Sequence, residues 1–130
     1  MTDYRFPKRL RLLSSNNFER VFAERQSVSD RWLVLYGGAN DVGHPRIGLT
    51  VSRKLGNATV RNRWKRLLRE AFRLKQHELP TIDFVCVPRA AEPPAFQELI
   101  ESLPALANRL QRKMEQQRKR MARQSEDPLY

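Results

Sequence analysis

An apolar stripe with helical period dominates the middle of the chain. Six residues recur at i, i+4, i+7, i+8, i+11 and i+12: Val60, Trp64, Leu67, Leu68, Ala71 and Phe72. At 3.6 residues per turn all six fall on one side of a helix. The opposite side collects Asn62, Arg66, Arg69 and Arg73. The stretch therefore predicts a helix over about 60–77 that is buried on one side and cationic on the other.

Three other stretches are typical of β-strands. Residues 46–52 place Ile47, Leu49 and Val51 on one face. Residues 82–87 form a short apolar run, which predicts a central strand. Within residues 27–37, Trp32, Val34 and Tyr36 alternate with Leu33 and Leu35, so both faces are apolar or aromatic. We expect this strand to pair with 46–52 as a hairpin.

Two further helices are predicted. One covers about 15–25, where Ser14 and Ser15 offer an N-cap and Phe18, Val21 and Phe22 share a face. The other covers about 95–111 and contains Pro104, which favours a kink. The resulting α+β organisation fits a single domain over 1–130. Residues 1–13 form a basic arm and residues 114–130 a basic, partly disordered tail that extends the helix or frays.

The charge of the chain is strongly positive and clustered. It carries 25 Lys and Arg against 14 Asp and Glu, a net charge of +11. Positions 46–75 hold ten basic residues with Glu70 as the only acid. Such a block concentrates self-repulsion that a polyanion relieves, so nucleic acid is the favoured partner. Membrane surfaces and acidic proteins remain as alternatives.

Several classes of protein are disfavoured. No apolar run approaches the ~20 residues of a membrane span, and the N-terminus lacks the apolar core of a secretion signal, which favours the cytoplasm. The single Cys86 excludes an internal disulfide and is expected to be a buried structural thiol. His44 and His77 lack neighbouring partners, and Glu70 and Asp83 are too isolated to predict a metal-dependent nuclease.

An ordered set of motifs runs through the chain. Val51-Ser52-Arg53-Lys54 ends a strand, and Arg61-Asn62-Arg63 follows in the basic helix. Before and after them come Arg11-Leu12-Leu13, Asn17-Phe18, Val21-Phe22, Phe72-Arg73 and Asp83-Phe84-Val85. Together these motifs resemble the bacterial ribonuclease P protein family, and the resemblance covers roughly residues 5–112. Trp64 departs from the smaller aliphatic residue common at its position, and we assign it to the core.

The resemblance implies a fold. It is a two-layer α+β sandwich with a small, mostly antiparallel four-stranded sheet, three helices and a left-handed β-α-β crossover, a fold shared with a domain of a ribosomal protein. That hand departs from the usual right-handed rule. The fourth strand would come from splitting Ser27-Val28-Ser29 away from 32–36.

The resemblance also implies a division of labour. A catalytic RNA subunit carries the chemistry that removes the 5′ leader of precursor transfer RNA, and holds most of the magnesium. The protein has no catalytic or metal-binding residue, binds no cofactor alone, and is a monomer without RNA. The implied RNA-subunit contacts are Arg53, Lys54, Arg61, Asn62, Arg63, Lys65, Arg66, Arg69 and Arg73. The implied leader contacts are Phe18, Phe22, Val34 and Tyr36.

Simpler interpretations stand beside these. Phe18 and Phe22 also suit an ordinary core face, and Trp32 suits either a core or an RNA-facing position. An autonomous protein nuclease is disfavoured because no acid, histidine or metal constellation is present. A ribosomal or general RNA-binding protein would explain the charge, since fold does not determine function, but not the ordered set of motifs.

Overall fold

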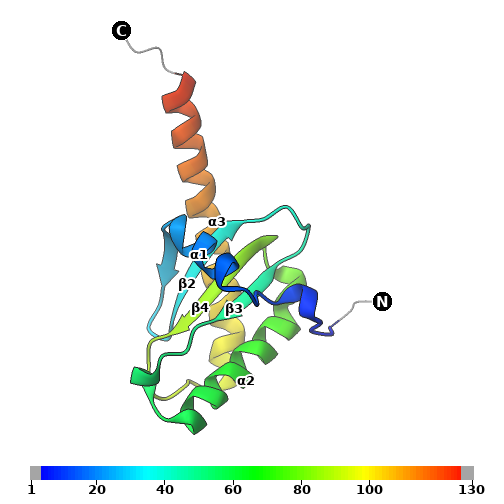
Figure 1. Cartoon of the computed structure of the whole chain (residues 1–130), viewed down its shortest axis with the longest axis vertical. Helices are drawn as coiled ribbons and strands as arrows, with labels where there is room; N and C mark the ends of the chain where they lie inside the picture. The colour runs from blue at the N-terminus through cyan, green and yellow to red at the C-terminus, as the bar shows by residue number, and fades with distance from the viewer. Residues whose placement is uncertain (1–3, 127–130) are drawn as a thin grey trace.

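The structure is a computed structural model that describes residues 4–126. Three α-helices and four strands form its body, joined by three short 3-10 turns (Figure 1). In chain order they are η1 (Lys8–Leu10), α1 (Ser15–Ala23), β1 (Gln26–Ser29), β2 (Leu33–Ala39), β3 (Arg46–Leu49), η2 (Arg53–Leu55), α2 (Ala58–Lys75), η3 (Gln76–Glu78), β4 (Ile82–Pro88) and α3 (Phe96–Glu126). The predicted helices and strands are all present.

The four strands form one sheet in the order β1-β2-β4-β3. β2 is antiparallel to both β1 and β4, whereas β3 is parallel to β4. The strand predicted over 27–37 is two strands. The Asp30 carboxylate accepts hydrogen bonds from the backbone N–H groups of Trp32 (2.8 Å) and Leu33 (2.9 Å), and so forms the turn between them.

The predicted hairpin between 27–37 and 46–52 is wrong. β4 occupies the side of β2 that this hairpin would have used. β3 lies beyond β4 and reaches it through the α2 crossover. Hydrophobic alternation identifies strands but not their partners, because each buried strand can pair on either side.

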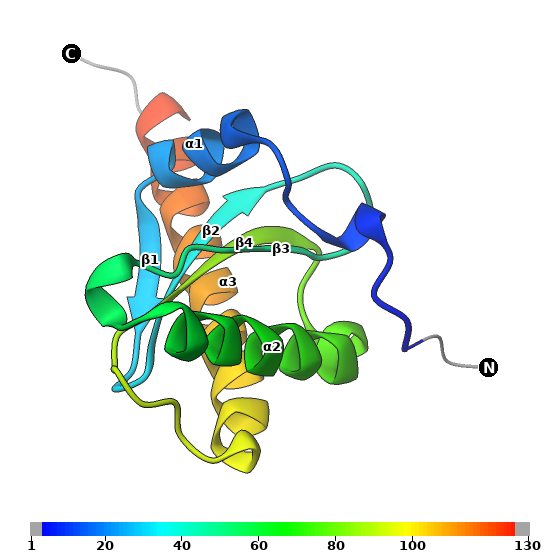
Figure 2. The same ribbon diagram turned by 60° about the horizontal axis from the view of Figure 1, so that its bottom comes forward.

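The two faces of the sheet carry different helices. Leu33 and Leu35 of β2, with Phe84 and Cys86 of β4, face α2 and α3 in the main core. Val85 of β4 joins Val21 of α1 in a smaller cluster on the other face. Figure 2 shows α1 and α2 on opposite sides of the strands. The α+β sandwich is confirmed, with α1 as a partial cover on the second face.

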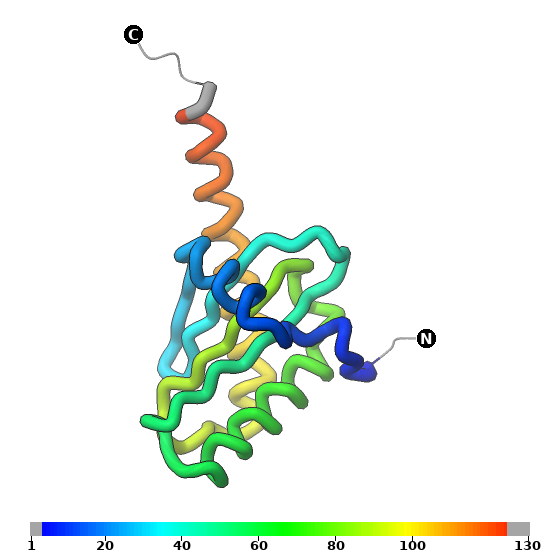
Figure 3. The backbone as a smooth tube through the Cα atoms, in the orientation of Figure 1, coloured from blue at the N-terminus to red at the C-terminus, as the bar shows by residue number. Residues whose placement is uncertain are grey.

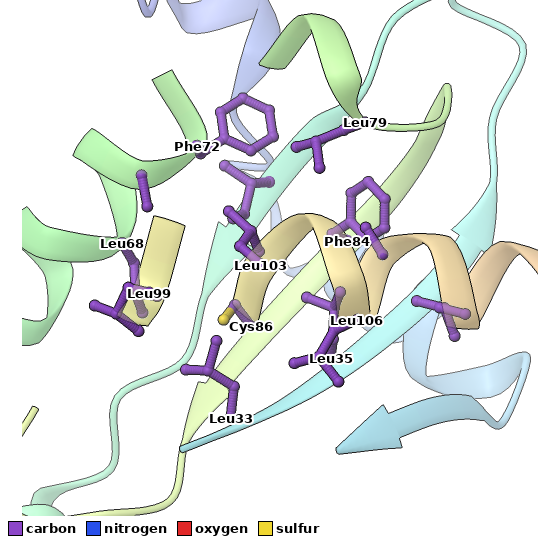
Figure 4. Packing of buried hydrophobic residues seen from close by; sticks show 14 of the residues in the cluster. Leu33, Leu35, Leu68, Phe72, Leu79, Phe84, Cys86, Leu99, Leu103 and Leu106 are labelled. Carbon is purple, nitrogen blue, oxygen red and sulfur yellow. The ribbon is translucent and has the colours of Figure 1, made fainter. Parts of the chain in front are cut away.

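The main core is built from leucines and aromatic rings between α2, α3 and the sheet (Figure 4). Trp64 is completely buried, as predicted, and its indole N–H donates to the carbonyl of Ala90 at 3.0 Å. Trp32 is half-buried and packs against this core. Cys86 is fully buried, and desolvation raises the pKa of its thiol to about 12, so it is a structural residue.

Side-chain caps begin the first two helices. Ser14 Oγ, at the predicted cap of the first helix, accepts from the N–H of Asn17 at 3.2 Å and starts α1. Asn57 is the N-cap of α2, with its side chain accepting from the N–H of Val60 at 3.1 Å. These bonds satisfy N–H groups that have no partner within the helix.

The N-terminal segment packs beside the sheet, and α3 extends into the segment predicted as a tail. In the basic arm, Leu10 and Leu12 are buried, and the N–H of Leu12 donates to the carbonyl of Ile47 at 2.9 Å, so the segment runs beside β3 (Figure 3). α3 continues to Glu126, giving a helical conformation to residues 114–126 of the predicted tail. Residues 1–3 and 127–130 of these segments lie outside the described residues. No helix within 4–126 has the length and apolarity to cross a membrane.

A buried carboxylate joins α1 to the sheet. Asp83 has no exposed side-chain surface and accepts two hydrogen bonds from Arg46 at 2.8 Å, one from Asn40 at 2.8 Å and one from Arg20 of α1. Burial alone raises the pKa of Asp83, but the hydrogen bonds from Arg46, Asn40 and Arg20 outweigh it and lower the pKa below its ordinary value. The carboxylate therefore stays charged and holds α1, the loop after β2, and β3 together.

Replacing Asp83 with asparagine should destabilise the protein by ~3 kcal/mol at neutral pH, because the half-buried Arg46 loses its counter-charge. The folded-state pKa of Asp83 is lowered, so its contribution is complete above the unfolded pKa of about 3.9 and is lost as the pH falls through the folded-state pKa. Urea unfolding followed by circular dichroism from neutral pH to below about pH 4 measures this. As the pH falls, the difference in the free energy of unfolding between wild type and Asp83→Asn should be constant at first and then become smaller. Asp41→Asn, in the exposed loop, is the control; equal losses for both would contradict the prediction.

Candidate nucleic-acid interface

The cationic side of α2 forms one wall of a groove of about 490 Å³. The other wall is the N-terminal segment. The groove is lined by Phe6, Arg11, Asn62, Lys65, Arg66, Arg69, Glu70 and Arg73. Five of the nine residues implied as RNA-subunit contacts therefore meet at one concave surface, which we call the α2 groove. Its walls offer guanidinium groups that can bind phosphate through two parallel hydrogen bonds.

Three residues of the α2 groove were not in the predicted site: Phe6, Arg11 and Glu70. The guanidinium of Arg11 stacks over the ring of Phe6, 4.6 Å from its centroid, and donates to the carbonyl of Phe6 at 3.1 Å. The Phe6 ring in turn packs against Phe72 of the core, with centroids 5.3 Å apart. Only the tertiary contact places this segment against α2. The basic composition of residues 5–11 was the available signal.

The remaining predicted cations lie outside the groove. Arg53 and Lys54 are exposed in η2, the turn that leads into α2. Arg63 is exposed on the helix flank. Arg61 is half-buried and donates to the carbonyl of Gly56 at 2.9 Å, so part of its role is to hold the connector.

Arg73 is tied within the protein. Its guanidinium pairs with Glu70, with Nε donating at 3.0 Å, and also donates to the carbonyl of Tyr4 at 3.2 Å. The hydrogen bond from Arg73 lowers the pKa of Glu70. The pair neutralises one end of the α2 groove, so Arg11, Lys65, Arg66 and Arg69 carry its net positive charge.

The four residues implied as leader contacts gather on the other face of the sheet. Phe22 and Tyr36 meet edge to face, with ring centroids 4.8 Å apart. Phe18 packs in the same cluster as Tyr36, and Val34 lies two residues along the same face of β2. Phe22 is 37% exposed, and the other three are half-buried. These positions form a partly exposed aromatic surface, which we call the α1 cleft.

Gly48 permits the close approach of α1 to β3. A Cβ atom at this position would lie 2.5 Å from Cζ of Phe18 and 3.1 Å from Cβ of Leu12. The missing side chain lets the Phe18 ring rest directly on the strand. Neither charge nor periodicity identified Gly48 as part of the site.

Within residues 4–126, no three His, Cys, Asp or Glu residues are grouped to hold a metal ion. Asp83 is occupied by its arginine and asparagine donors. The two surfaces offer groups that suit RNA binding: cations and amides in the α2 groove, and aromatic edges in the α1 cleft.

Known proteins share this sequence and fold. A family model described as Ribonuclease P matches residues 6–111. The chain is 49% identical over 90 residues to the ribonuclease P protein component of Photorhabdus laumondii, covering 68% of this chain and 76% of that protein. It is 50% identical over 88 residues to the protein component of Serratia proteamaculans, covering 67% and 74%.

Among solved structures, the RNase P protein from Thermotoga maritima superposes with a TM-score of 0.70 at 33% identity, covering 76% of this chain and 96% of that one. The mixed four-stranded sheet with three helices is thus the fold that the resemblance implied. The sequence match, the extent of the family model and the shared fold show that this chain belongs to the ribonuclease P protein family.

Proposed function

We propose that this chain is the protein subunit of a ribonucleoprotein endonuclease that removes the 5′ leader of precursor transfer RNA. The observation that carries the proposal is the separation of two binding surfaces on one small domain. The α2 groove is concave and cationic, and the α1 cleft, across the sheet from α2, is aromatic. A protein that must bind two RNA segments at once needs two such surfaces.

The α2 groove and its connector suit the catalytic RNA subunit. Arg66 and Arg69 are exposed and carry little internal pairing, so their guanidinium groups are available for phosphates of a folded RNA. Asn62 is exposed beside them and both donates and accepts hydrogen bonds. The rest of this surface lies along α2 and η2 and comprises Arg53, Lys54, Arg61, Arg63, Lys65 and Arg73.

The α1 cleft suits the single-stranded leader. Unpaired bases can stack on aromatic rings such as Phe22 and Tyr36, with about 1–3 kcal/mol per base. The double-stranded body of transfer RNA offers no exposed bases for such contacts. The cleft would therefore favour precursor over mature transfer RNA.

The phosphodiester chemistry belongs to the RNA in this proposal. The RNA subunit holds the magnesium ions that the reaction needs, and the protein contributes binding and orientation without a cofactor of its own. The protein acts in the cytoplasm and is a monomer until it binds RNA.

A reconstitution experiment tests this assignment. A bacterial ribonuclease P RNA at low magnesium should cleave precursor transfer RNA at the mature 5′ end only when this protein is added, because the protein's cations replace part of the ionic screening. The protein alone is the control. Cleavage by protein alone would reveal a missed active site, and failure to rescue a competent RNA would favour a ribosomal-type RNA-binding protein.

Single substitutions should separate the two surfaces. Arg66→Ala should weaken assembly with the RNA subunit about fivefold, through loss of phosphate contacts. Phe22→Ala should leave assembly unchanged but reduce the preference for precursor over mature transfer RNA by about fivefold or more, through loss of base stacking. Filter binding to the RNA subunit and to both transfer RNA forms measures these effects.

Arg118→Ala and Leu13→Ala are matched controls, since both residues are exposed and lie outside the two surfaces. The assignment of surfaces fails if Arg66→Ala and Phe22→Ala change both binding reactions to the same extent.

A further inference from the structure

The C-terminal half of α3 carries a row of cations along one side. Projected at 100° per residue, six basic residues fall within about 120° of one another. We call them the α3 cationic face: Arg109, Arg112, Lys113, Lys119, Arg120 and Arg123. Glu115 and Arg118 lie on other sides of the helix. Together with Met114 and Met121 they line a separate groove.

Arg109 and Lys113 bond to β1, but the other cations of this face have no structural role that explains their charge. Arg112, Arg120 and Arg123 are exposed and have no hydrogen-bond or ion-pair partner among residues 4–126. Like charges four residues apart, such as Lys119 and Arg123, disfavour a helix. The helix dipole favours cations only in the last turn. The family match ends at residue 111, so most of the row lies outside the region on which membership of the family rests.

The α3 cationic face begins at the free edge of the sheet. Lys113 Nζ donates to the carbonyl of Ser27 at 2.7 Å, and Arg109 donates to the carbonyl of Ser29 at 3.4 Å. β1 is an edge strand, and Ser27 pairs directly with Tyr36 of the α1 cleft. The cations therefore start at the edge strand next to β2, the strand that carries Tyr36 of the α1 cleft, while α3 itself packs on the opposite face of the sheet from α1. From there α3 continues past the sheet (Figure 3).

The two cationic surfaces lie toward opposite edges of the sheet. The connector to the α2 groove follows β3, whereas the α3 cationic face flanks β1. If the α2 groove holds the catalytic RNA, the leader enters the α1 cleft from the β3 side, beside the cleavage site. Its distal end then leaves across β1, toward α3.

We propose that the α3 cationic face binds the phosphate backbone of the 5′-distal part of the leader, as a continuation of the α1 cleft. This inference rests on the proposed function. The face has cations but no aromatic side chain, so it follows the backbone without reading bases. A long leader thus contacts both surfaces, and a short leader contacts only the cleft.

The test uses the reconstituted holoenzyme and precursors with leaders of about 5 and about 15 nucleotides, lengths that span the range of single-strand binding sites. The variant is Arg112→Gln, Arg120→Gln and Arg123→Gln combined. Arg109 and Lys113 stay in place, because they hold α3 against β1. Glutamine is a good helix former, and circular dichroism verifies that the helix persists.

The triple variant should bind the long-leader precursor roughly tenfold more weakly, and the slope of log affinity against log salt should fall by about 2, since each lost phosphate contact removes ~0.7. Binding of the short-leader precursor should not change. As a matched pair of single variants, Arg120→Gln should weaken long-leader binding whereas Arg118→Gln, on another side of the same helix, should not.

Three results would overturn the proposal. Unchanged binding of the long-leader precursor excludes the contact. Equal weakening for short leaders, or for the RNA subunit alone, assigns the face to a different RNA segment. Absence of any leader preference in the wild-type holoenzyme would remove the proposed function and this inference together.

Discussion

The buried Asp83 carboxylate is the interaction on which the placement of α1, and so of the α1 cleft, depends. It receives hydrogen bonds from α1, from the loop after β2 and from β3, while its own strand, β4, lies between β2 and β3. A charge without solvent exposure is costly unless its lone pairs are filled, and Arg46, Asn40 and Arg20 fill them. The orientation of α1, and hence the opening of the α1 cleft, follows from this one group.

Successive side chains of a strand point to opposite faces of the sheet, and this alternation places the two binding surfaces on opposite sides. Along β4, Phe84 and Cys86 face the α2–α3 core, whereas Val85 and Val87 face α1. Each face of the sheet supports one surface, so the aromatic cleft and the cationic groove are held at fixed positions by the same strands. The structure thereby gives a small domain two distinct sites without a second core.

The features predicted correctly from the sequence are those that depend on residues close together in the chain. The stripe from Val60 to Phe72, the Ser14 cap and the buried Trp64 depend on neighbouring residues, and each is confirmed. Strand pairing is non-local, and the expected hairpin with 46–52 is wrong because β4 takes that side of β2. The groove contributions of Phe6 and Arg11 were missed for the same reason, since their partners lie on α2 and in the core.

The sequence by itself determined the helices, the strands, the clustering of charge and the family, because periodicity, caps and ordered motifs are properties of adjacent residues. Only the tertiary structure decided which strands pair, that the N-terminal segment walls the α2 groove, and that Asp83 is the anchor of α1. It also placed the cations of α3 at the β1 edge. These depend on contacts between distant residues, whose energies arise only when the sheet and both helical layers are assembled.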